Sequence, residues 1–151
     1  MTENSLNRKT FVVPGPPKGK GRPRLGRYGN VRTPEGTIVY ENWVKTCYLQ
    51  QLVTGMSPKD REPLKCPVDV FIMCEYPIPK STSLVKKEAM LSGEILPAKY
   101  PDIDNIMKAI CDSLNGLAYE DDRQVVSCSV MKKYGPTPQV TVTIQEAGHA
   151  I

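Results

Sequence analysis

The sequence contains little material for a zinc site or a disulfide framework. Its single histidine, His149, falls in the last three residues, and its five cysteines form an odd set with no CxxC spacing. Because zinc sites are built from Cys and His ligands, a structural zinc centre is not expected. Most of the cysteines instead lie in or beside apolar segments, as reduced core thiols do, which indicates a reducing compartment. These cysteines are Cys66, Cys74, Cys111 and Cys128.

Long apolar runs are also missing. No stretch approaches the ~18 to 20 residues needed to span a bilayer. Residues 1–5 do not show the basic segment followed by an apolar one that marks a secretory leader. We therefore expect neither secretion nor membrane insertion, and we expect a cytoplasmic protein.

Acidic residues are absent from one part of the chain. Between Arg8 and Arg32 there are eight Lys and Arg and no Asp or Glu, although the net charge of the whole chain is only +4. Such asymmetry favours a nucleic-acid partner. Cations interleaved with Gly and Pro predict a phosphate-binding loop, and a solvated charge run is the alternative. The candidate DNA-binding residues are Lys18, Lys20, Arg22, Arg24, Arg27 and Arg32.

The apolar pattern predicts one domain of the α/β (α+β) class. Alternating apolar residues predict strands at residues 10–13, 68–76, 124–132 and 139–145. Helical spacing predicts helices at residues 40–52 and 103–114, and a short helix at 83–91 inside a polar insertion at 77–100. These elements fit a small mixed four-stranded sheet with the two main helices packed on one face.

Carboxylates gather around the second predicted main helix. Asp102 and Asp104 lie at its start, Lys108 follows one turn later, and Asp121 and Asp122 precede the next strand. Like charges held close together repel unless a cation neutralises them, and Mg²⁺ prefers oxygen ligands. Asp102 and Asp104, together with the Asp121–Asp122 pair, are therefore candidate ligands of a metal ion. Lys108 is predicted to act in catalysis by stabilising charge on a phosphate.

Each of these residues also has a plain structural interpretation. Asp102 suits a helix N-cap, and Asp121 and Asp122 suit a turn. Lys108 can form an i,i+4 salt bridge with Asp104 or Asp112. Two other functions follow from such interpretations. A non-catalytic protein that binds branched or single-stranded DNA would need the carboxylates only as caps and turns. A magnesium-dependent hydrolase of nucleotides would use the carboxylates but not so extended a basic surface.

Two blocks of the sequence resemble the RusA family of Holliday-junction resolvases. The first is PDIDNIMKAICDSLNGLAYEDDRQVV at residues 101–126, and the second is PPKGKGRPRLGRYGNVRTPEGTIVYE at residues 16–41. The insertion PKSTSLVKKEAMLSGEI is similar to that of a branch found in Gram-positive phages.

The resemblance implies a function, a cofactor and an assembly. It implies a structure-selective endodeoxyribonuclease that cuts four-way junctions or other branched DNA, encoded by a phage or prophage. It implies a Mg²⁺ ion, for which Mn²⁺ can substitute, bound by Asp102, Asp104 and Asp122. Lys108 would then be the catalytic lysine, and Asp121 would assist. It also implies a homodimer. We expect a single nuclease domain at residues 10–146, between disordered ends at residues 1–9 and 147–151.

Overall fold

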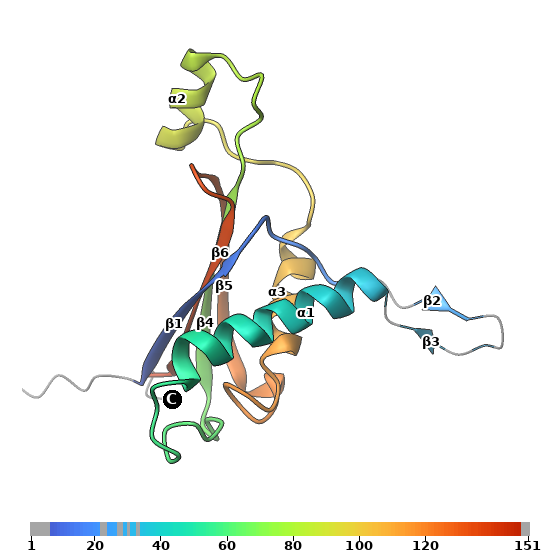
Figure 1. Cartoon of the computed structure of the whole chain (residues 1–151), viewed down its shortest axis with the longest axis vertical. Helices are drawn as coiled ribbons and strands as arrows, with labels where there is room; N and C mark the ends of the chain where they lie inside the picture. The colour runs from blue at the N-terminus through green and yellow to red at the C-terminus, as the bar shows by residue number, and fades with distance from the viewer. Residues whose placement is uncertain (1–6, 22–23, 27–28, 30, 33, 149–151) are drawn as a thin grey trace, which may run out of the picture.

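The computed structural model describes residues 7–21, 24–26, 29, 31–32 and 34–148. Most of its elements belong to one layered unit, and a two-stranded ribbon and a small helix project from it (Figure 1). The strands are β1 (Arg8–Pro14), β2 (Arg24–Leu25), β3 (Val31–Arg32), β4 (Val68–Tyr76), β5 (Val125–Tyr134) and β6 (Gln139–Glu146). The helices are α1 (Glu35–Tyr48), the π-helix η1 (Leu49–Val53), α2 (Leu84–Ser92), α3 (Ile103–Ser113) and the 3-10 helix η2 (Asp122–Gln124).

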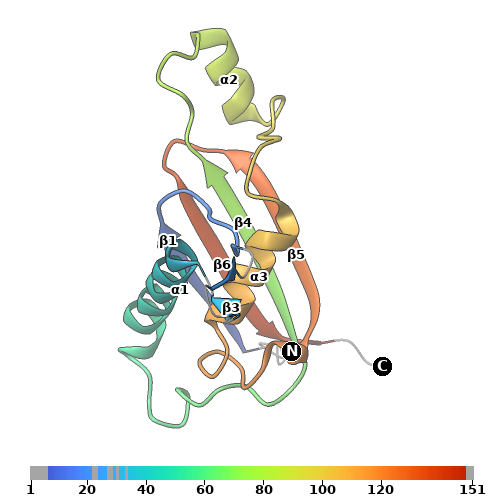
Figure 2. The same ribbon diagram turned by 90° about the vertical axis from the view of Figure 1, so that its right-hand side faces the viewer.

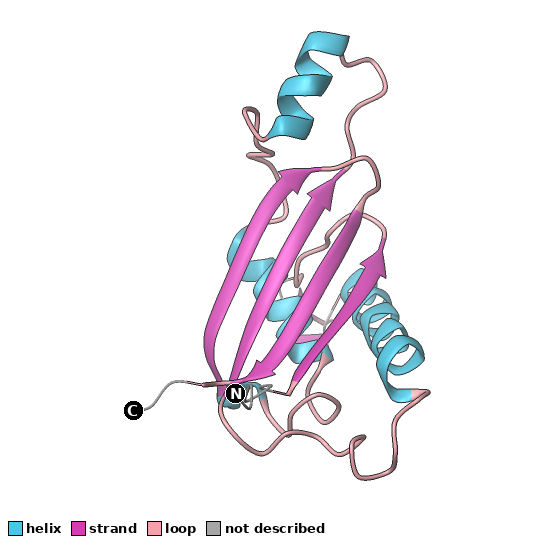
Figure 3. Ribbon diagram, turned by 90° about the vertical axis from the view of Figure 1, so that its left-hand side faces the viewer, coloured by secondary structure: helices cyan, strands magenta, loops and turns pink. Residues whose placement is uncertain are grey.

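The main sheet is mixed and has the strand order β1-β6-β4-β5. Strand β6 is antiparallel to both of its neighbours, and β4 is parallel to β5. Helices α1 and α3 lie side by side on one face, and Figure 2 shows them in front of the strands. The opposite face has no helix over it among the described residues, as Figure 3 shows. The predicted mixed four-stranded sheet with its two main helices on one face is confirmed.

The core lies between the sheet and these two helices. Strand β4 alternates as its sequence predicts, because Val68, Val70, Ile72, Cys74 and Tyr76 are all buried. Helix α3 contributes the fully buried Ile106, Ile110 and Leu114, whereas Ile103, predicted to share this stripe, is 49% exposed at the first turn. None of the described helices is long and apolar enough to cross a membrane, and all five cysteines are free thiols.

Several predicted boundaries are wrong by a few residues. Helix α1 begins at Glu35, five residues before the predicted start at Tyr40, and its N-cap position is held by Pro34 without a side-chain hydrogen bond. Because no capping side chain marks this start, the sequence offers no signal for it. The insertion helix α2 begins after Ser83, whose side chain accepts a hydrogen bond from the Lys86 N–H, and it ends at the left-handed Gly93.

The expected disordered ends also begin too far inward. Arg8 and Lys9 are strand residues that pair with Gln145 and Ile144, so the ordered domain starts before residue 10. The Ala147 N–H donates a hydrogen bond to the Pro67 carbonyl at 2.9 Å, which holds the chain beyond residue 146. Residues 1–6 and 149–151, which include His149, lie outside the described residues.

Strand β5 departs from its predicted face at one position. The register with β4 shifts between Val68 and Asp69, so that Val68 pairs with Val125 but Asp69 pairs with Ser127. The unpaired Val126 is therefore 57% exposed, although alternation placed it beside Cys128 and Val130. A β-bulge of this kind changes which side chains of the strand point inward, without any change in the apolar spacing of the sequence.

The basic loop is anchored between the first turns of α1 and α3. The Lys20 N–H donates a hydrogen bond to the Asn105 carbonyl at 2.9 Å, and the Gly21 N–H donates one to the Thr37 hydroxyl at 2.8 Å. A Cβ at Gly19 would lie 2.9 Å from the Cβ atoms of both Asn105 and Pro101. Glycine is therefore required here because other parts of the protein, not only a ligand, come this close.

This close approach predicts opposite effects of two glycine-to-alanine substitutions. Gly19→Ala should lower the free energy of unfolding by about 1–3 kcal/mol, because the added methyl group forces the loop away from α3. Gly36→Ala is the matched control, since Gly36 lies in α1 with open space around it. It should raise the stability by about 0.5–1 kcal/mol through helix propensity. Urea denaturation of both variants tests this, and equal effects would contradict the assignment of Gly19.

Candidate active site

The two carboxylates that open α3 are exposed and unengaged. Asp102 occupies the N-cap position with extended backbone, yet its side chain makes no capping hydrogen bond. Its carbonyl accepts the first helical hydrogen bond, from the Ile106 N–H. Neither Asp102 nor Asp104 has a side-chain hydrogen bond or ion pair among the residues that the structure describes. The capping interpretation of the Asp102 side chain is therefore wrong, and both carboxylates remain available to a ligand.

Asp122 is the first residue of η2 and lies next to Asp112 of α3. The two carboxyl groups are hydrogen bonded to each other, and Asp112 is the residue one turn after Lys108. Eight residues separate Asp104 from Asp112, which corresponds to about 12 Å along a helix axis. Among the described residues, no three His, Cys, Asp or Glu side chains are close enough together to hold a metal ion. The structure thus does not bring Asp122 together with Asp102 and Asp104 in a three-carboxylate cluster.

The pKa values of Asp112 and Asp122 are shifted in opposite directions. Burial, followed by the hydrogen bond to Asp112, raises the pKa of Asp122 above its ordinary value. Burial acts in the same direction on Asp112, but the hydrogen bonds from Lys20 and Lys108 outweigh it and hold the pKa of Asp112 below its ordinary value. Asp112 thus receives the stabilisation from the two lysines, whereas Asp122 bears the cost of the like charge beside it.

Lys108 is in contact with this pair. Its Nζ atom donates a hydrogen bond to Asp112 Oδ1 at 3.2 Å, so the expected i,i+4 salt bridge is formed with Asp112 and not with Asp104. The side chain nevertheless remains 59% exposed. Together with Met107, Cys111, Asp122 and residues of β5, it lines a shallow hollow between α3 and that strand. An exposed ammonium group above a hollow is available to an incoming anion.

Asp121 has a structural task. Its side chain accepts a hydrogen bond from the Arg123 N–H at 2.9 Å, and Gln124 Oε1 accepts one from the Asp121 N–H. These two bonds form a capping box at the start of η2. The whole turn is tied to α3 because the buried Tyr119 hydroxyl donates a 2.6 Å hydrogen bond to the Cys111 carbonyl. The position of Asp122 against α3 follows from these contacts.

The six cations predicted to bind DNA have different surroundings. Lys18 is exposed. Lys20 Nζ donates hydrogen bonds to Glu41 Oε1 and Asp112 Oδ2, both at 2.8 Å, and only 22% of its side chain is exposed. Burial lowers the pKa of Lys20, but these two carboxylates outweigh it and the pKa lies above its ordinary value. Lys20 is thus the central cation of an internal network.

The remaining arginines belong to the projecting ribbon. Arg24 and Arg32 are paired with each other in the β2–β3 ladder, where the sequence predicted an irregular loop. Arg22 and Arg27 lie outside the described residues. Figure 1 shows the ribbon extending away from the sheet beyond the first turn of α1.

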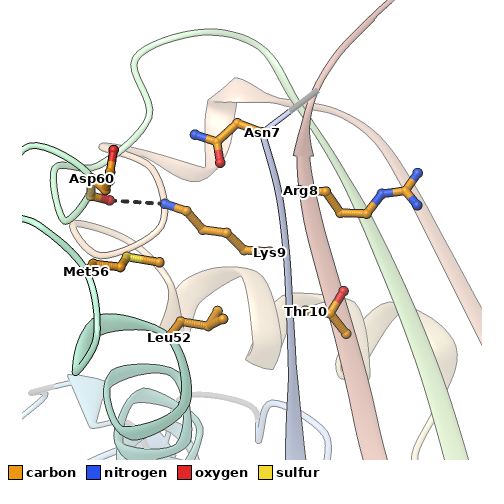
Figure 4. Close-up of a pocket in the computed structure, with 7 residues that line it drawn as sticks. All are labelled: Asn7, Arg8, Lys9, Thr10, Leu52, Met56 and Asp60. Atoms are coloured by element: carbon orange, nitrogen blue, oxygen red, sulfur yellow. Dashed lines mark hydrogen bonds between the residues drawn. The ribbon is translucent and has the colours of Figure 1, made fainter. Parts of the chain in front are cut away.

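A second hollow, near the start of β1, has a different character. It is lined by Asn7, Lys9, Leu52, Met56 and Asp60 among others, and Figure 4 shows Lys9 and Arg8 pointing to opposite sides of the strand. Lys9 Nζ donates a 3.4 Å hydrogen bond to the Asp60 carbonyl, and burial lowers the pKa of this lysine. We assign this contact to holding the loop after η1 against the sheet.

Two comparisons with known proteins bear on this arrangement. A protein-family model described as "Endodeoxyribonuclease RusA" matches residues 14–145. A relative named "Uncharacterized protein YqaN", from Bacillus subtilis (strain 168), is 36% identical over 140 residues, which cover 90% of this chain and 94% of the relative. The matched region includes the basic loop, α3 and the Asp121–Asp122 turn.

The surroundings of Lys20 and Lys18 predict different effects of removing each charge. Lys20→Met should lower the free energy of unfolding by about 2 kcal/mol, because Glu41 and Asp112 both lose a charged hydrogen-bond donor. Lys18→Met, the control for an exposed lysine in the same loop, should change it by less than about 0.5 kcal/mol. Thermal and urea denaturation of both variants measure the difference. Unchanged stability of Lys20→Met would mean that the network does not hold the loop.

Proposed function

Because this chain belongs to the RusA endodeoxyribonuclease family, we propose that it is a magnesium-dependent, structure-selective nuclease that resolves Holliday junctions or related branched DNA. The observation that carries the proposal is the position of the Asp102–Asp104 pair. Two unengaged carboxylates open α3 directly beside Pro101 and Asn105, against which the base of the basic loop packs. A site for a hard cation and a strongly cationic segment thus meet at one place.

The donor chemistry at this place suits Mg²⁺. This ion is commonly bound through one or two carboxylates together with waters and substrate phosphates, so that Asp102 and Asp104 are a sufficient protein contribution. Bound there, the ion would supply charge stabilisation to a phosphodiester under attack by water. We assign Asp122 to the same function, although its carboxyl group is hydrogen bonded to Asp112 in this structure. Mn²⁺, which accepts the same oxygen ligands, is expected to substitute.

The chain's own cations have separate tasks in this proposal. Lys108, exposed on the ridge of α3 between the two carboxylate pairs, stabilises negative charge on the phosphate. Lys18 and the arginines of the β2–β3 ribbon hold backbone phosphates, which provides affinity without base specificity. Lys20 acts indirectly, by fixing the loop against α1 and α3.

Cleavage of a synthetic four-way junction tests the catalytic assignment. We expect cutting with Mg²⁺, none with EDTA, and recovery when Mg²⁺ is restored. Asp104→Asn should abolish cutting but leave junction binding intact or stronger, because one negative charge near the phosphates is removed. Lys108→Met should lower the single-turnover rate by a factor on the order of a hundred.

Glu62→Gln provides the control, since Glu62 is an exposed carboxylate in the loop between η1 and β4. It should cut at the parental rate. Near-parental cutting by Asp104→Asn would refute the metal assignment. Binding of junctions without any cutting by the parent would favour a non-catalytic DNA-binding protein, and hydrolysis of nucleotides but not DNA would favour the other alternative.

We also propose that the active form is a homodimer assembled through the uncovered face of the main sheet. The centre of that face is apolar or uncharged, with Phe71 39% and Met131 59% exposed beside Met73, Thr141 and Thr143. Each end of the face holds one positive and one negative residue. Arg8 and Asp69 are at one end, and Lys133 is paired with Glu75 at the other. Such a face does not repel its own copy, and a two-fold dimer matches the two-fold character of a four-way junction.

If the protein dimerises through this face, a single substitution there should lower the molecular mass of the species in solution. Met131→Glu should convert a dimer into a monomer, because it places a charge at the centre of the apolar face. Leu84→Glu is the control, since Leu84 is 72% exposed on the projecting α2. Sedimentation equilibrium of the parent and both variants gives the answer. A monomeric parent would overturn the dimer, and a dimeric Met131→Glu variant would overturn this interface.

A further inference from the structure

Two lysines and two tyrosines form a cluster at one end of the main sheet. Tyr76 and Tyr134 end the neighbouring strands β4 and β5 and are paired in the ladder. Lys99 Nζ lies 5.6 Å from the centroid of the Tyr76 ring and 5.3 Å from that of Tyr134. Lys132 Nζ lies 5.8 Å from the centroid of the Tyr76 ring. We call Tyr76, Lys99, Lys132 and Tyr134 the lysine–tyrosine cluster.

The cluster concentrates positive charge without a carboxylate. Neither lysine forms an ion pair within the part of the chain that the structure describes, whereas their neighbour Lys133 is paired with Glu75. Lys132 Nζ donates a hydrogen bond to the Lys99 carbonyl at 2.8 Å, which leaves its positive charge uncompensated. Aromatic rings attract each ammonium group, but they do not cancel the repulsion between two cations drawn to the same ring. The arrangement therefore suits an anion that both lysines could contact.

The cluster lies beside the candidate active site. The Tyr76 hydroxyl donates a 3.5 Å hydrogen bond to the carbonyl of Pro101, the residue before Asp102. Lys99 precedes Asp102 by three residues in the segment that runs from α2 to α3, along the same end of the sheet (Figure 2). A DNA strand bears one phosphate charge per about 3.4 Å of rise. If such a strand is bound at the Asp102–Asp104 pair, its next phosphates therefore lie near the lysine–tyrosine cluster.

Burial of the rings indicates which part of a nucleic acid binds. Tyr76 is only 3% exposed, and Lys99 and Lys132 lie over it, so its ring cannot serve as a stacking platform for a base. The two lysines themselves reach solvent, because Lys99 is exposed and Lys132 is half-buried. The two lysines thus offer charge at the surface while the covered Tyr76 ring offers no face to a base, which fits a backbone phosphate.

We propose that Lys99 and Lys132, held over Tyr76 and Tyr134, bind a DNA backbone phosphate next to the point of cleavage. The tyrosines are positioning residues that fix the two cations. This proposal rests on the proposed function as far as the ligand is DNA, but it requires binding only and not cutting.

Salt-dependent binding of a four-way junction in EDTA tests the proposal, because cutting and metal are then excluded. The Lys99→Met/Lys132→Met double variant should bind on the order of tenfold more weakly at low salt. Its slope of log affinity against log salt should be smaller by about one for each phosphate that the variant no longer binds. The reduction should be alike for linear duplex and junction, and Lys99→Arg/Lys132→Arg should restore the parental slope by keeping both charges.

The control variant removes the same net charge at the opposite end of the sheet. Lys59→Met/Lys65→Met changes two exposed lysines of the loop between η1 and β4 and should leave the slope unchanged. An equal fall in both double variants would show a general charge effect and overturn the site. A parental slope in the cluster variant, with or without a lower melting temperature, would leave the four residues a purely structural role.

Failure of the proposed function and failure of the phosphate site give different results. A parent that binds no DNA overturns the proposed function and the phosphate site together. A parent that binds but whose cluster variant keeps its slope overturns only the site. Single Lys99→Met, in which an exposed side chain is changed, keeps the measurement possible if the double variant does not fold.

Discussion

The Lys20 ammonium group connects three segments that are far apart in the sequence. It bonds to Glu41 on α1 and to Asp112 on α3, which are 21 and 92 residues away along the chain. The backbone on either side is fixed by the bonds to Asn105 and Thr37. Because the side chains involved are mostly buried, removal of one partner leaves the others without compensation in a region of low dielectric. The relative positions of the basic loop, α1 and α3 depend on this network.

The same network determines where a cation is needed on α3. Asp112 is paired with two lysines, and its neighbour Asp122 is hydrogen bonded to it. Asp102 and Asp104 receive no such partner among the described residues, and they are offset only by water and by the positive end of the helix dipole. The demand for a cation is therefore greatest at the first turn, beside the anchored glycines of the loop. Two carboxylate pairs with the same composition thus differ in their surroundings, since only Asp112 has lysine partners among the described residues.

Regular alternation and helical spacing were sufficient to predict much of this fold. Strand β4 has the predicted bounds, Val68 to Tyr76, because each of its buried positions on the inward face is apolar. Features that depend on tertiary contact were not predictable. The bulge that exposes Val126 leaves no mark in the spacing, and a run of cations does not reveal that Lys20 has partners 21 and 92 residues away. The pattern of cations and glycines likewise does not reveal that Gly19 lies close to Pro101 and Asn105.

The candidate site, like the fold, could be predicted from the sequence only in part. The sequence pattern predicted Asp102 and Asp104 at the start of one helix, with Lys108 on the same face as Asp104 because residues four apart share a face. It could not place Asp122, whose position depends on the Tyr119 hydroxyl bond to the Cys111 carbonyl and on the capping box of Asp121. Those contacts hold the turn against the last turns of α3 rather than the first. Any arrangement in which Asp122 joined Asp102 and Asp104 would first have to break its hydrogen bond to Asp112. That step would also bring a third carboxylate beside Asp102 and Asp104, so it is favourable only where a cation or a further positive group offsets the repulsion among them.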